Sequence, residues 1–309
     1  MSMSSATITG ITLLAALAAM ALLAPWLVPP GSPIHPASID LSACNCPVGT
    51  PGHILGTDHL GRDIFGQAVW GARASLAVGL MAAAVAVSVG SLWGSFSALS
   101  GGLVDMIMMR IVDGLLSIPS IVLLLALQAL VSTPALAGVL PAPVLEALAV
   151  TNYSFGLLPL VTVVLVVSAT TWLEAARLAH AQVLAVKQQE YVLAARALGV
   201  GASGMLMRHL LPNARVVIVV EAALLVSDAV LMESGLSFLG LGLGPGIPSW
   251  GGMLASAQTA LIQGNWWAAV VPGLFITATV LAVNLIGEGS LARTPRRKDS
   301  VKDVSAMSF

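Results

Sequence analysis

Three acidic residues occur in a long apolar stretch at residues 214–236: Glu221, Asp228 and Glu233. Glu221 and Asp228 are seven residues apart, so in a helix they share a face. A charged group at the centre of a membrane helix costs ~2.5–3.5 kcal/mol, and three such groups facing lipid would oppose insertion by roughly 8–10 kcal/mol. We therefore expect these residues to face the interior of a bundle, a partner or the membrane interface.

Other patterns that could support chemistry are weak. The chain has no GxxxxGK[ST] phosphate loop, so we expect it not to hydrolyse nucleotides itself, and we predict no catalytic residues. His53 and His59 lie in one loop without further ligands, so no metal site is predicted. Cys44 and Cys46 are too few for a disulfide scaffold, and they are either two free thiols or a strained Cys-x-Cys disulfide.

The amino-acid composition indicates whether the chain is surrounded by water or by lipid. Of the 309 residues, 57% are hydrophobic and only 9% are charged, and the mean hydropathy is +0.95. Soluble domains carry about 25% charged residues. The net charge of −1 gives no sign of nucleic-acid binding. The chain is therefore predicted to be an all-α integral membrane protein.

A helix needs about 20 apolar residues to cross the membrane. Six stretches of the sequence meet this requirement, and each is predicted to be a transmembrane helix: roughly 8–28, 75–98, 107–132, 154–175, 214–236 and 266–288.

Lys and Arg residues are concentrated in alternate connections. The second, fourth and final connections, with the adjoining span ends, hold eleven of them, and the other connections hold only Arg62 and Arg73. The positive-inside rule then predicts that both termini are cytoplasmic. Residues 30–72, 133–153 and 237–265 are predicted to be external.

The longest internal connection, residues 176–213, contains a short amphipathic helix. Its apolar stripe has the spacing i, i+3, i+4 and i+7 and comprises Tyr191, Ala194, Ala195 and Leu198. Gly199 and Gly201 interrupt this helix, and a second one is predicted to run from Ser203 and to stop at Pro212. From the residues alone, the stripe is equally suited to cover the ends of the spans or to insert into a groove of another protein.

Three separated motifs, between residues 55 and about 290, carry a family resemblance. Tyr191–Gly199, with the Leu-Pro of residues 211–212 at the family spacing, resembles the EAA loop of binding-protein-dependent ABC importer permeases. The other two narrow the resemblance to the C-type subunit of the dipeptide, oligopeptide and nickel group. They are Leu55–Asp63 running on to Gly71–Leu76, and Glu233–Gly242 with Pro248–Gly251.

The resemblance implies the type I ABC importer permease fold in a bacterial cytoplasmic membrane. It implies three kinds of protein partner, namely a homologous B-type permease, two ABC ATPase subunits and an extracytoplasmic solute-binding protein. ATP and Mg would be bound by the ATPases, with no cofactor on this chain. The predicted ATPase-coupling residues are Glu190, Tyr191, Ala194, Ala195, Leu198, Gly199, Arg208 and Pro212. Leu193 stands where the family usually has Glu, and Glu190 lies one turn earlier.

The resemblance also suggests roles for polar residues elsewhere. Asp228, with Glu221, either lines a pathway suited to the ammonium group of a peptide or is neutralised by Arg215 or the second permease. Glu233 is expected to tether the loop that follows it. The candidates for the external, binding-protein-facing surface are Asp58, Arg62, Asp63, Glu233 and Trp250.

The sequence thus divides into a first span with an external loop (1–72), a core transmembrane domain (73–290) and a cytoplasmic tail (291–309). The predicted function is that of the pathway-forming permease subunit of an ATP-driven dipeptide or oligopeptide importer, which is not itself an enzyme. The alternative is a proton-coupled secondary peptide transporter that uses Asp228 and Glu221 as proton relays. The six spans show no obvious inverted repeat that would favour this alternative. The sequence does not distinguish peptides from nickel chelates as the substrate.

Overall fold

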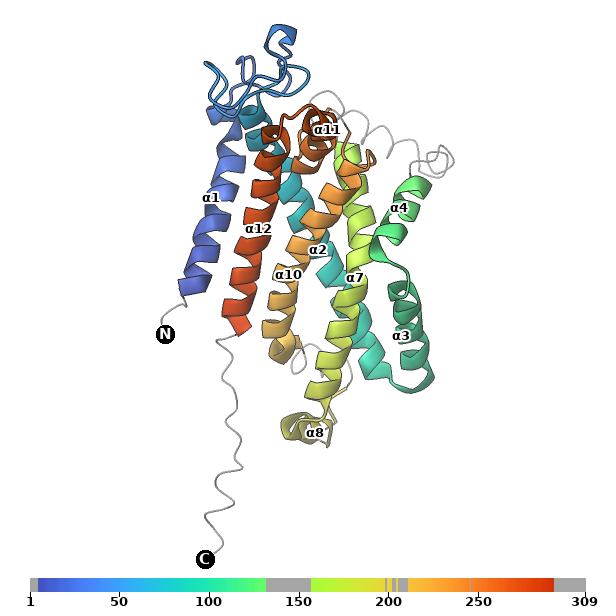
Figure 1. Cartoon of the computed structure of the whole chain (residues 1–309). Helices are drawn as coiled ribbons and strands as arrows, with labels where there is room; N and C mark the ends of the chain where they lie inside the picture. Colours follow the sequence, from blue (N-terminus) through green and yellow to red (C-terminus); the bar gives the residue numbers. More distant parts are fainter. Residues whose placement is uncertain are drawn as a thin grey trace, which may run out of the picture.

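The computed structural model describes residues 5–131, 157–197, 199–201, 204, 211–244 and 246–291, and its regular elements in these ranges are all helical. Long helices form one bundle (Figure 1). They are α1 (Ser5–Leu27), α2 (Ile64–Ser100), α3 (Gly102–Leu116), α4 (Ser120–Val131), α7 (Leu157–Lys187), α10 (Leu211–Phe238) and α12 (Trp267–Leu291). The remaining elements are η1 (Leu41–Ala43), α8 (Glu190–Ala197) and α11 (Trp250–Ile262).

The bundle has two distinct ends. At one end, here called the α8 end, lie α8, the start of α1 and the end of α12 (Figure 1). At the other, the α11 end, lie α11 and the segment that joins α1 to α2. The N-terminal end of α1 and the C-terminal end of α12 therefore lie on the same side of the bundle as α8.

The predicted six spans agree with the helices. Four helices in the described residues are long and apolar enough to cross a membrane, and the α3–α4 pair makes five if it counts as one span. Helix α10 has 28 residues, enough for a crossing, although its three acidic residues make it less apolar. The protein is thus a multi-pass membrane protein.

The third predicted span, 107–132, is not one straight helix. Helices α3 and α4 are bent by 93° at residues 117–119. Pro119 lacks a backbone N–H and disfavours the helical conformation at the residue before it, so the helix ends at Leu116 and restarts at Ser120. At 1.5 Å per residue, neither the 15-residue half nor the 12-residue half alone would cross ~30 Å of hydrocarbon.

Two other spans are longer than predicted. Helix α2 begins at Ile64, eleven residues before the predicted 75, because the Asp63 carboxylate caps it by accepting a hydrogen bond from the Gly66 N–H at 2.7 Å. Helix α7 continues to Lys187. Its last turns bury Ala179 and Val183, so residues 176–187 belong to the bundle and not to the predicted internal loop.

Part of the predicted external loop 237–265 is also helical. Residues 250–262 form α11, which begins where the Ser249 hydroxyl accepts a hydrogen bond from the Gly252 N–H at 3.0 Å. The predicted external loop 133–153 lies outside the described residues.

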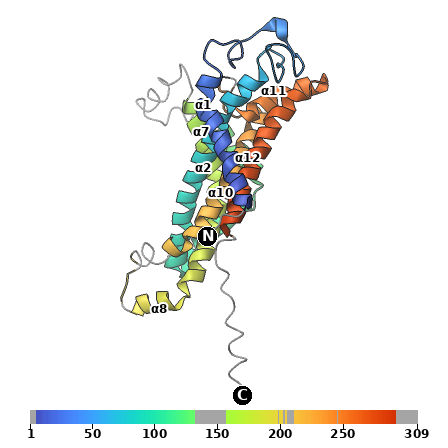
Figure 2. The same ribbon diagram turned by 90° about the vertical axis from the view of Figure 1, so that its left-hand side faces the viewer.

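Helices α2 and α7 pack against each other along much of their length (Figure 2). Glycines on α2 allow this approach, because a Cβ at Gly90 or Gly94 would collide with backbone atoms of α7. Small residues at a helix crossing let two backbones come close, which favours association in lipid. The contact between α2 and α7 is therefore the most extensive helix–helix contact of the bundle among the described residues.

Candidate functional site

Helix α8 projects from the α8 end of the bundle, beyond the last turn of α7 (Figures 1 and 2). Val192, which is only 1% exposed, packs with Ala98 of α2 and Val183 of α7. Its neighbour Tyr191 is 44% exposed, and Glu190 is exposed as well. Successive residues of a helix point about 100° apart, so α8 has one side fixed to the bundle and another that presents an aromatic ring.

The residue that holds α8 to the bundle is not part of the predicted stripe. Val192 is the residue after Tyr191. The only signal in the sequence for its contact with the bundle is that its side chain is aliphatic. The side chains of Ala194 and Ala195 lie outside the described residues, as do Leu198 and Arg208 entirely. Gly199 has a positive φ of 83°, which suits the predicted end of the helix.

The sequence predicted that a helix stops at Pro212, but the structure places this residue inside a helix. It lies in the first turn of α10, where the missing N–H leaves no hydrogen bond unmade. The predicted second helix of the loop falls on residues that are mostly outside the described ranges.

The pathway candidates Glu221 and Asp228 lie on α10 and are half-buried. A third carboxylate, Glu174 of α7, interacts electrostatically with both of them. No basic side chain pairs with these three acids among the residues that the structure describes. The side chain of Arg215, one of the predicted partners, lies outside the described residues.

Sequence reasoning missed Glu174 because the predicted fourth span ended next to it, at residue 175. The structure continues α7 for another three turns, and Glu174, which is exposed, lines a hollow on this helix with Arg177 and Leu116. Glu221 lines a separate small pocket with Ser91 and Gln182. The acidic residues thus come from two helices of the bundle.

At the α11 end, two of the external candidates are buried in a hydrogen-bond network that orders the loop before α2. Asp58 accepts hydrogen bonds from the backbone N–H groups of Leu60 and Arg62, both at 2.9 Å, and from the Arg62 Nε at 2.8 Å. Gln67 donates to the second Asp58 oxygen at 3.1 Å. Asp63 caps α2 and contacts the His53 Nδ1 at 2.9 Å. Both acids act within the chain.

Glu233 and Trp250 meet at a junction of three elements. The carboxylate of Glu233 is fully buried and accepts hydrogen bonds from the hydroxyls of Ser237 at 2.7 Å and Ser75 at 3.3 Å. The Ser75 hydroxyl also accepts a hydrogen bond from the Trp250 backbone N–H at 3.1 Å. Glu233 on α10 is therefore linked through Ser75 on α2 to the start of α11.

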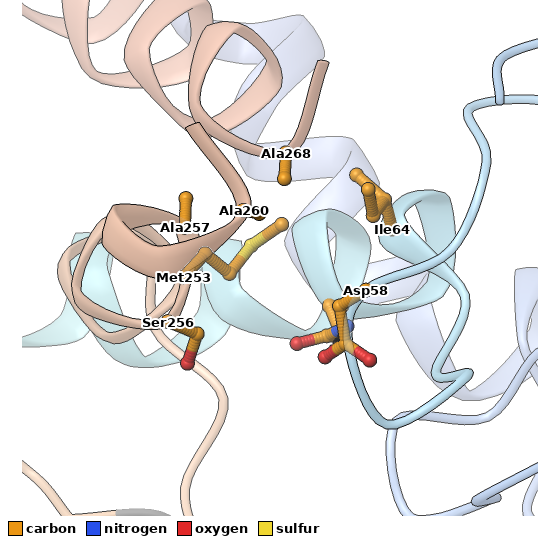
Figure 3. Close-up of a pocket in the computed structure, with 8 residues that line it drawn as sticks. Asp58, Ile64, Met253, Ser256, Ala257, Ala260 and Ala268 are labelled. Atoms are coloured by element: carbon orange, nitrogen blue, oxygen red, sulfur yellow. Dashed lines mark hydrogen bonds between the residues drawn. The ribbon is translucent and has the colours of Figure 1, made fainter. Parts of the chain in front are cut away.

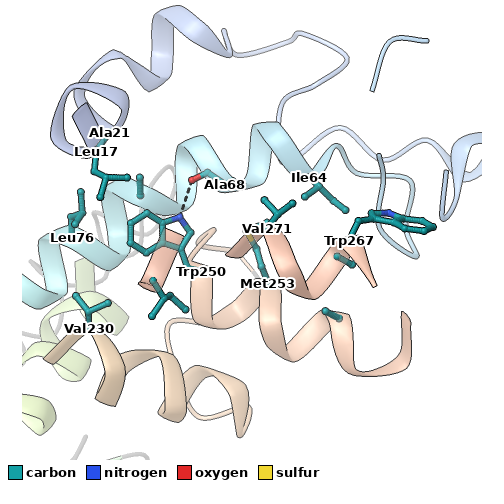
Figure 4. Packing of buried hydrophobic residues seen from close by; sticks show 14 of the residues in the cluster. Leu17, Ala21, Ile64, Ala68, Leu76, Val230, Trp250, Met253, Trp267 and Val271 are labelled. Carbon is teal, nitrogen blue, oxygen red and sulfur yellow. Dashed lines mark hydrogen bonds between the residues drawn. The ribbon is translucent and has the colours of Figure 1, made fainter. Parts of the chain in front are cut away.

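The Trp250 ring is the centre of the core at this end (Figure 4). It is fully buried, stacks on Phe275 of α12 with ring centroids 5.7 Å apart, and donates from Nε1 to the Ala68 carbonyl oxygen at 3.0 Å. Nearby, the pocket in Figure 3 is lined mainly by small or apolar side chains of α11 and α12, with Asp58 at its edge. The core around Trp250 is closely packed, and the Asp58 and Glu233 carboxylates are buried beside it.

Of the five external candidates, Arg62 borders a large cavity at the α11 end. The cavity has a volume of about 590 Å³ and is also lined by Gln67, Trp70 and His35. The two cysteines of the adjoining loop are free thiols. No cluster of three or more potential metal ligands occurs among the described residues.

The sequence is similar to known transport proteins over most of its length. Residues 86–299 match the family described as binding-protein-dependent transport system inner membrane component. The dipeptide transport system permease protein DppC of Bacillus subtilis is 34% identical over 280 residues, covering 91% of this chain and 78% of that protein. OppC, the oligopeptide transport system permease protein of the same organism, is 37% identical over 237 residues, covering 77% and 69%.

The probable D,D-dipeptide transport system permease protein DdpC of Escherichia coli is 33% identical over 286 residues, covering 93% of this chain and 86% of that protein. The family match covers more than half of the chain, and its helices include enough apolar spans for a multi-pass protein. This protein therefore belongs to the inner membrane components of binding-protein-dependent transport systems, which are permease subunits of ABC importers and not enzymes.

Proposed function

We propose that this protein is the C-type permease subunit of an ATP-driven importer of dipeptides or oligopeptides. The relatives reported above are named as dipeptide, oligopeptide or D,D-dipeptide permeases, and each similarity extends over at least 77% of this chain. The observation that carries the proposal is the geometry of α8. Val192 anchors it to the bundle while Tyr191 projects away, as a coupling element requires.

The orientation follows from the charges. The α8 end faces the cytoplasm, because α2, α7 and α12, which precede the Lys- and Arg-rich segments of the sequence, all end on this side. The α11 end then faces the outside of a bacterial cytoplasmic membrane. In this orientation the cavity beside Arg62 opens toward the external binding protein, whereas α8 points toward the ATPases.

The working complex contains this chain, a homologous B-type permease, two ABC ATPase subunits and a solute-binding protein. ATP and Mg are bound by the ATPases. Their closure on ATP draws the α8 helices of the two permeases together, and the paired bundles open toward the outside. Hydrolysis restores the inward-facing state. Within the pathway, the carboxylates of Glu174, Glu221 and Asp228 attract the ammonium group of a peptide.

A charge placed on α8 tests the coupling element. Ala195→Asp or Leu198→Asp puts a carboxylate in the predicted apolar docking stripe, and burying an unpaired charge is strongly unfavourable. We expect the ATPases to be lost when the complex is purified through this chain, with membrane insertion unchanged. Gln189→Asp, at an exposed residue just before α8, is the matched control. Normal ATPase recovery with both stripe variants would exclude the stripe as the docking surface.

A second experiment separates the importer from a proton-coupled transporter. The purified chain is reconstituted in liposomes alone or with the second permease, the ATPases and the binding protein, and uptake of a labelled dipeptide is measured. We expect uptake only in the complete system with ATP. Uptake by the chain alone on a proton gradient would contradict the proposal.

A further inference from the structure

Three helices of the bundle are joined by a group of polar side chains at the α8 end. Asp105 of α3 accepts two hydrogen bonds on the same carboxylate oxygen, from the Ser97 hydroxyl of α2 at 2.5 Å and from the His180 Nε2 of α7 at 2.7 Å. Lys187, the last residue of α7, donates to the Ala98 carbonyl oxygen of α2 at 2.9 Å. We call Ser97, Asp105, His180 and Lys187 the polar clamp.

The clamp lies directly beside the anchor of α8. Ala98, which follows Ser97, packs with Val183 and Val192 in one buried cluster. Val183 is three residues from His180 and four from Lys187, so the three side chains share a face of α7. The contact that fixes α8 and the contacts that fix α3 therefore use the same turns of α2 and α7.

The clamp is partly shielded from solvent. The side chains of His180 and Asp105 are only 16% and 24% exposed, so solvent screens their interaction less than it screens a surface ion pair. Asp105 also lies in the first turn of α3, where the helix dipole favours a negative charge. Hydrogen bonds to a charged acceptor are shorter and stronger than those between neutral groups.

The far end of α3 is a hinge. The 93° bend at residues 117–119 separates α3 from α4, which packs instead on α7 and α10. Near its start, α3 follows α2 after Gly101 and Gly102, both with positive φ, and such short glycine links do not fix the angle between two helices. The clamp thus ties the start of α3 to α2 and α7, and farther along α3 the buried Val112 packs with Leu173 and Ala176 of α7.

We propose that the polar clamp makes α3 follow α8, so that movement imposed on α8 swings α3 about the bend at residues 117–119. The inference rests on the proposed function, in which ATPase closure moves α8. It assigns positioning roles to Asp105, His180, Ser97 and Lys187, none of which belongs to the predicted coupling motif. Without the clamp, α8 still binds the ATPases, but its displacement reaches α3 only through the apolar contacts of Val112 and its neighbours, and not at the start of the helix.

The test measures coupling in the assembled complex. Asp105→Ala and His180→Ala are compared with Asp113→Ala, an acidic residue on α3 whose side chain is exposed. We expect the clamp variants to retain ATPase binding and basal ATP hydrolysis within about twofold, while dialanine uptake per ATP falls about tenfold, as expected for loss of a hydrogen bond to a charged group. His180→Gln, whose amide can still donate, should recover part of the uptake.

The double variant Asp105→Ala/His180→Ala should be no worse than Asp105→Ala alone, because His180 acts through Asp105. Unchanged uptake per ATP in the single variants would overturn the inference, as would uptake and hydrolysis that fall together with complex assembly. Failure of the proposed function is recognised separately, since the unmodified complex would then show no ATP-dependent uptake.

A distance measurement tests the movement directly. With Cys44 and Cys46 replaced by Ser, nitroxide labels are attached at Ile107→Cys on α3 and Gln189→Cys beside α8, both exposed positions. We expect the distance between the labels to stay constant when ATP is added to the complex, and to change when Asp105→Ala is present. A change of equal size with and without the clamp would refute the inference.

Discussion

Replacing Gly94 with Ala tests whether α2 and α7 are held in backbone contact near the α8 end. A Cβ at this position would collide with the carbonyl oxygen of Ala176 and lie 2.8 Å from the backbone nitrogen of His180. Both atoms belong to the main chain of α7, which cannot rotate aside as a side chain can. We expect the two helices to be pushed apart, with loss of the packing between them.

The size of the effect is obtained by comparison with Gly114→Ala. Gly114 is inside α3, and a Cβ there would have no atom within 4 Å. Alanine is favoured over glycine in a helix by about 1 kcal/mol, which applies to both variants and cancels in the comparison. What remains is the overpacking at Gly94, about 1–3 kcal/mol. Gly114→Ala should be at least as stable as the unmodified protein.

The free energy of unfolding is measured for each variant by titrating the detergent-solubilised protein with sodium dodecyl sulfate and following its helical circular dichroism. Gly94→Ala should unfold at lower denaturant than Gly114→Ala. A midpoint equal to or above that of the control would show that α2 and α7 are not in backbone contact at this point. The contact between α2 and α7 would then not be the closest helix contact of the bundle.

Three further predictions concern single side chains. Asp63→Ala removes the cap of α2 and should lower the free energy of unfolding by ~1–2 kcal/mol, while Asp63→Asn retains most of it; equal losses in a thermal melt would argue against the cap. Trp250→Phe deletes the hydrogen bond to the Ala68 carbonyl and should lower the free energy of unfolding by ~1 kcal/mol. Trp250→Ala should lower it by ~3–5 kcal/mol in the same dodecyl sulfate titration. An unchanged free energy of unfolding for Trp250→Ala would contradict the buried position of the ring. Asp228→Asn should lower dipeptide uptake more than complex assembly, and the reverse result would indicate a structural role.

The sequence was sufficient to predict the helices that depend on a local pattern of apolar residues. Apolar length alone located the spans, because each helix must satisfy its own backbone in lipid. The α8 helix was predicted from the stripe that begins at Tyr191. The break at Pro119 was also readable, but apolar length outweighed the proline when the third span was drawn.

Contacts between distant segments could not be predicted in the same way. Nothing near Glu174 in the sequence indicates that it interacts with Glu221 and Asp228, about fifty residues later. Asp58 and Asp63 are predicted to face the binding protein because they lie in the predicted external loop 30–72, yet their carboxylates accept hydrogen bonds from N–H groups within the chain. Burial of a charged side chain depends on partners that three-dimensional packing supplies.

Helix α2 connects the two ends at which these contacts occur. Ser75 links it to Glu233 and Trp250 at the α11 end, and Ser97 belongs to the polar clamp. The two serines are separated by 22 residues, about 33 Å along the helix. Since Gly90 and Gly94 hold α2 against α7 between these points, α2 cannot slide freely along its neighbour. In the proposed complex, a displacement of α8 would therefore reach the α11 end as a tilt of the α2–α7 pair, and the buried Glu233–Ser75–Trp250 junction would pass that tilt to α10 and α11.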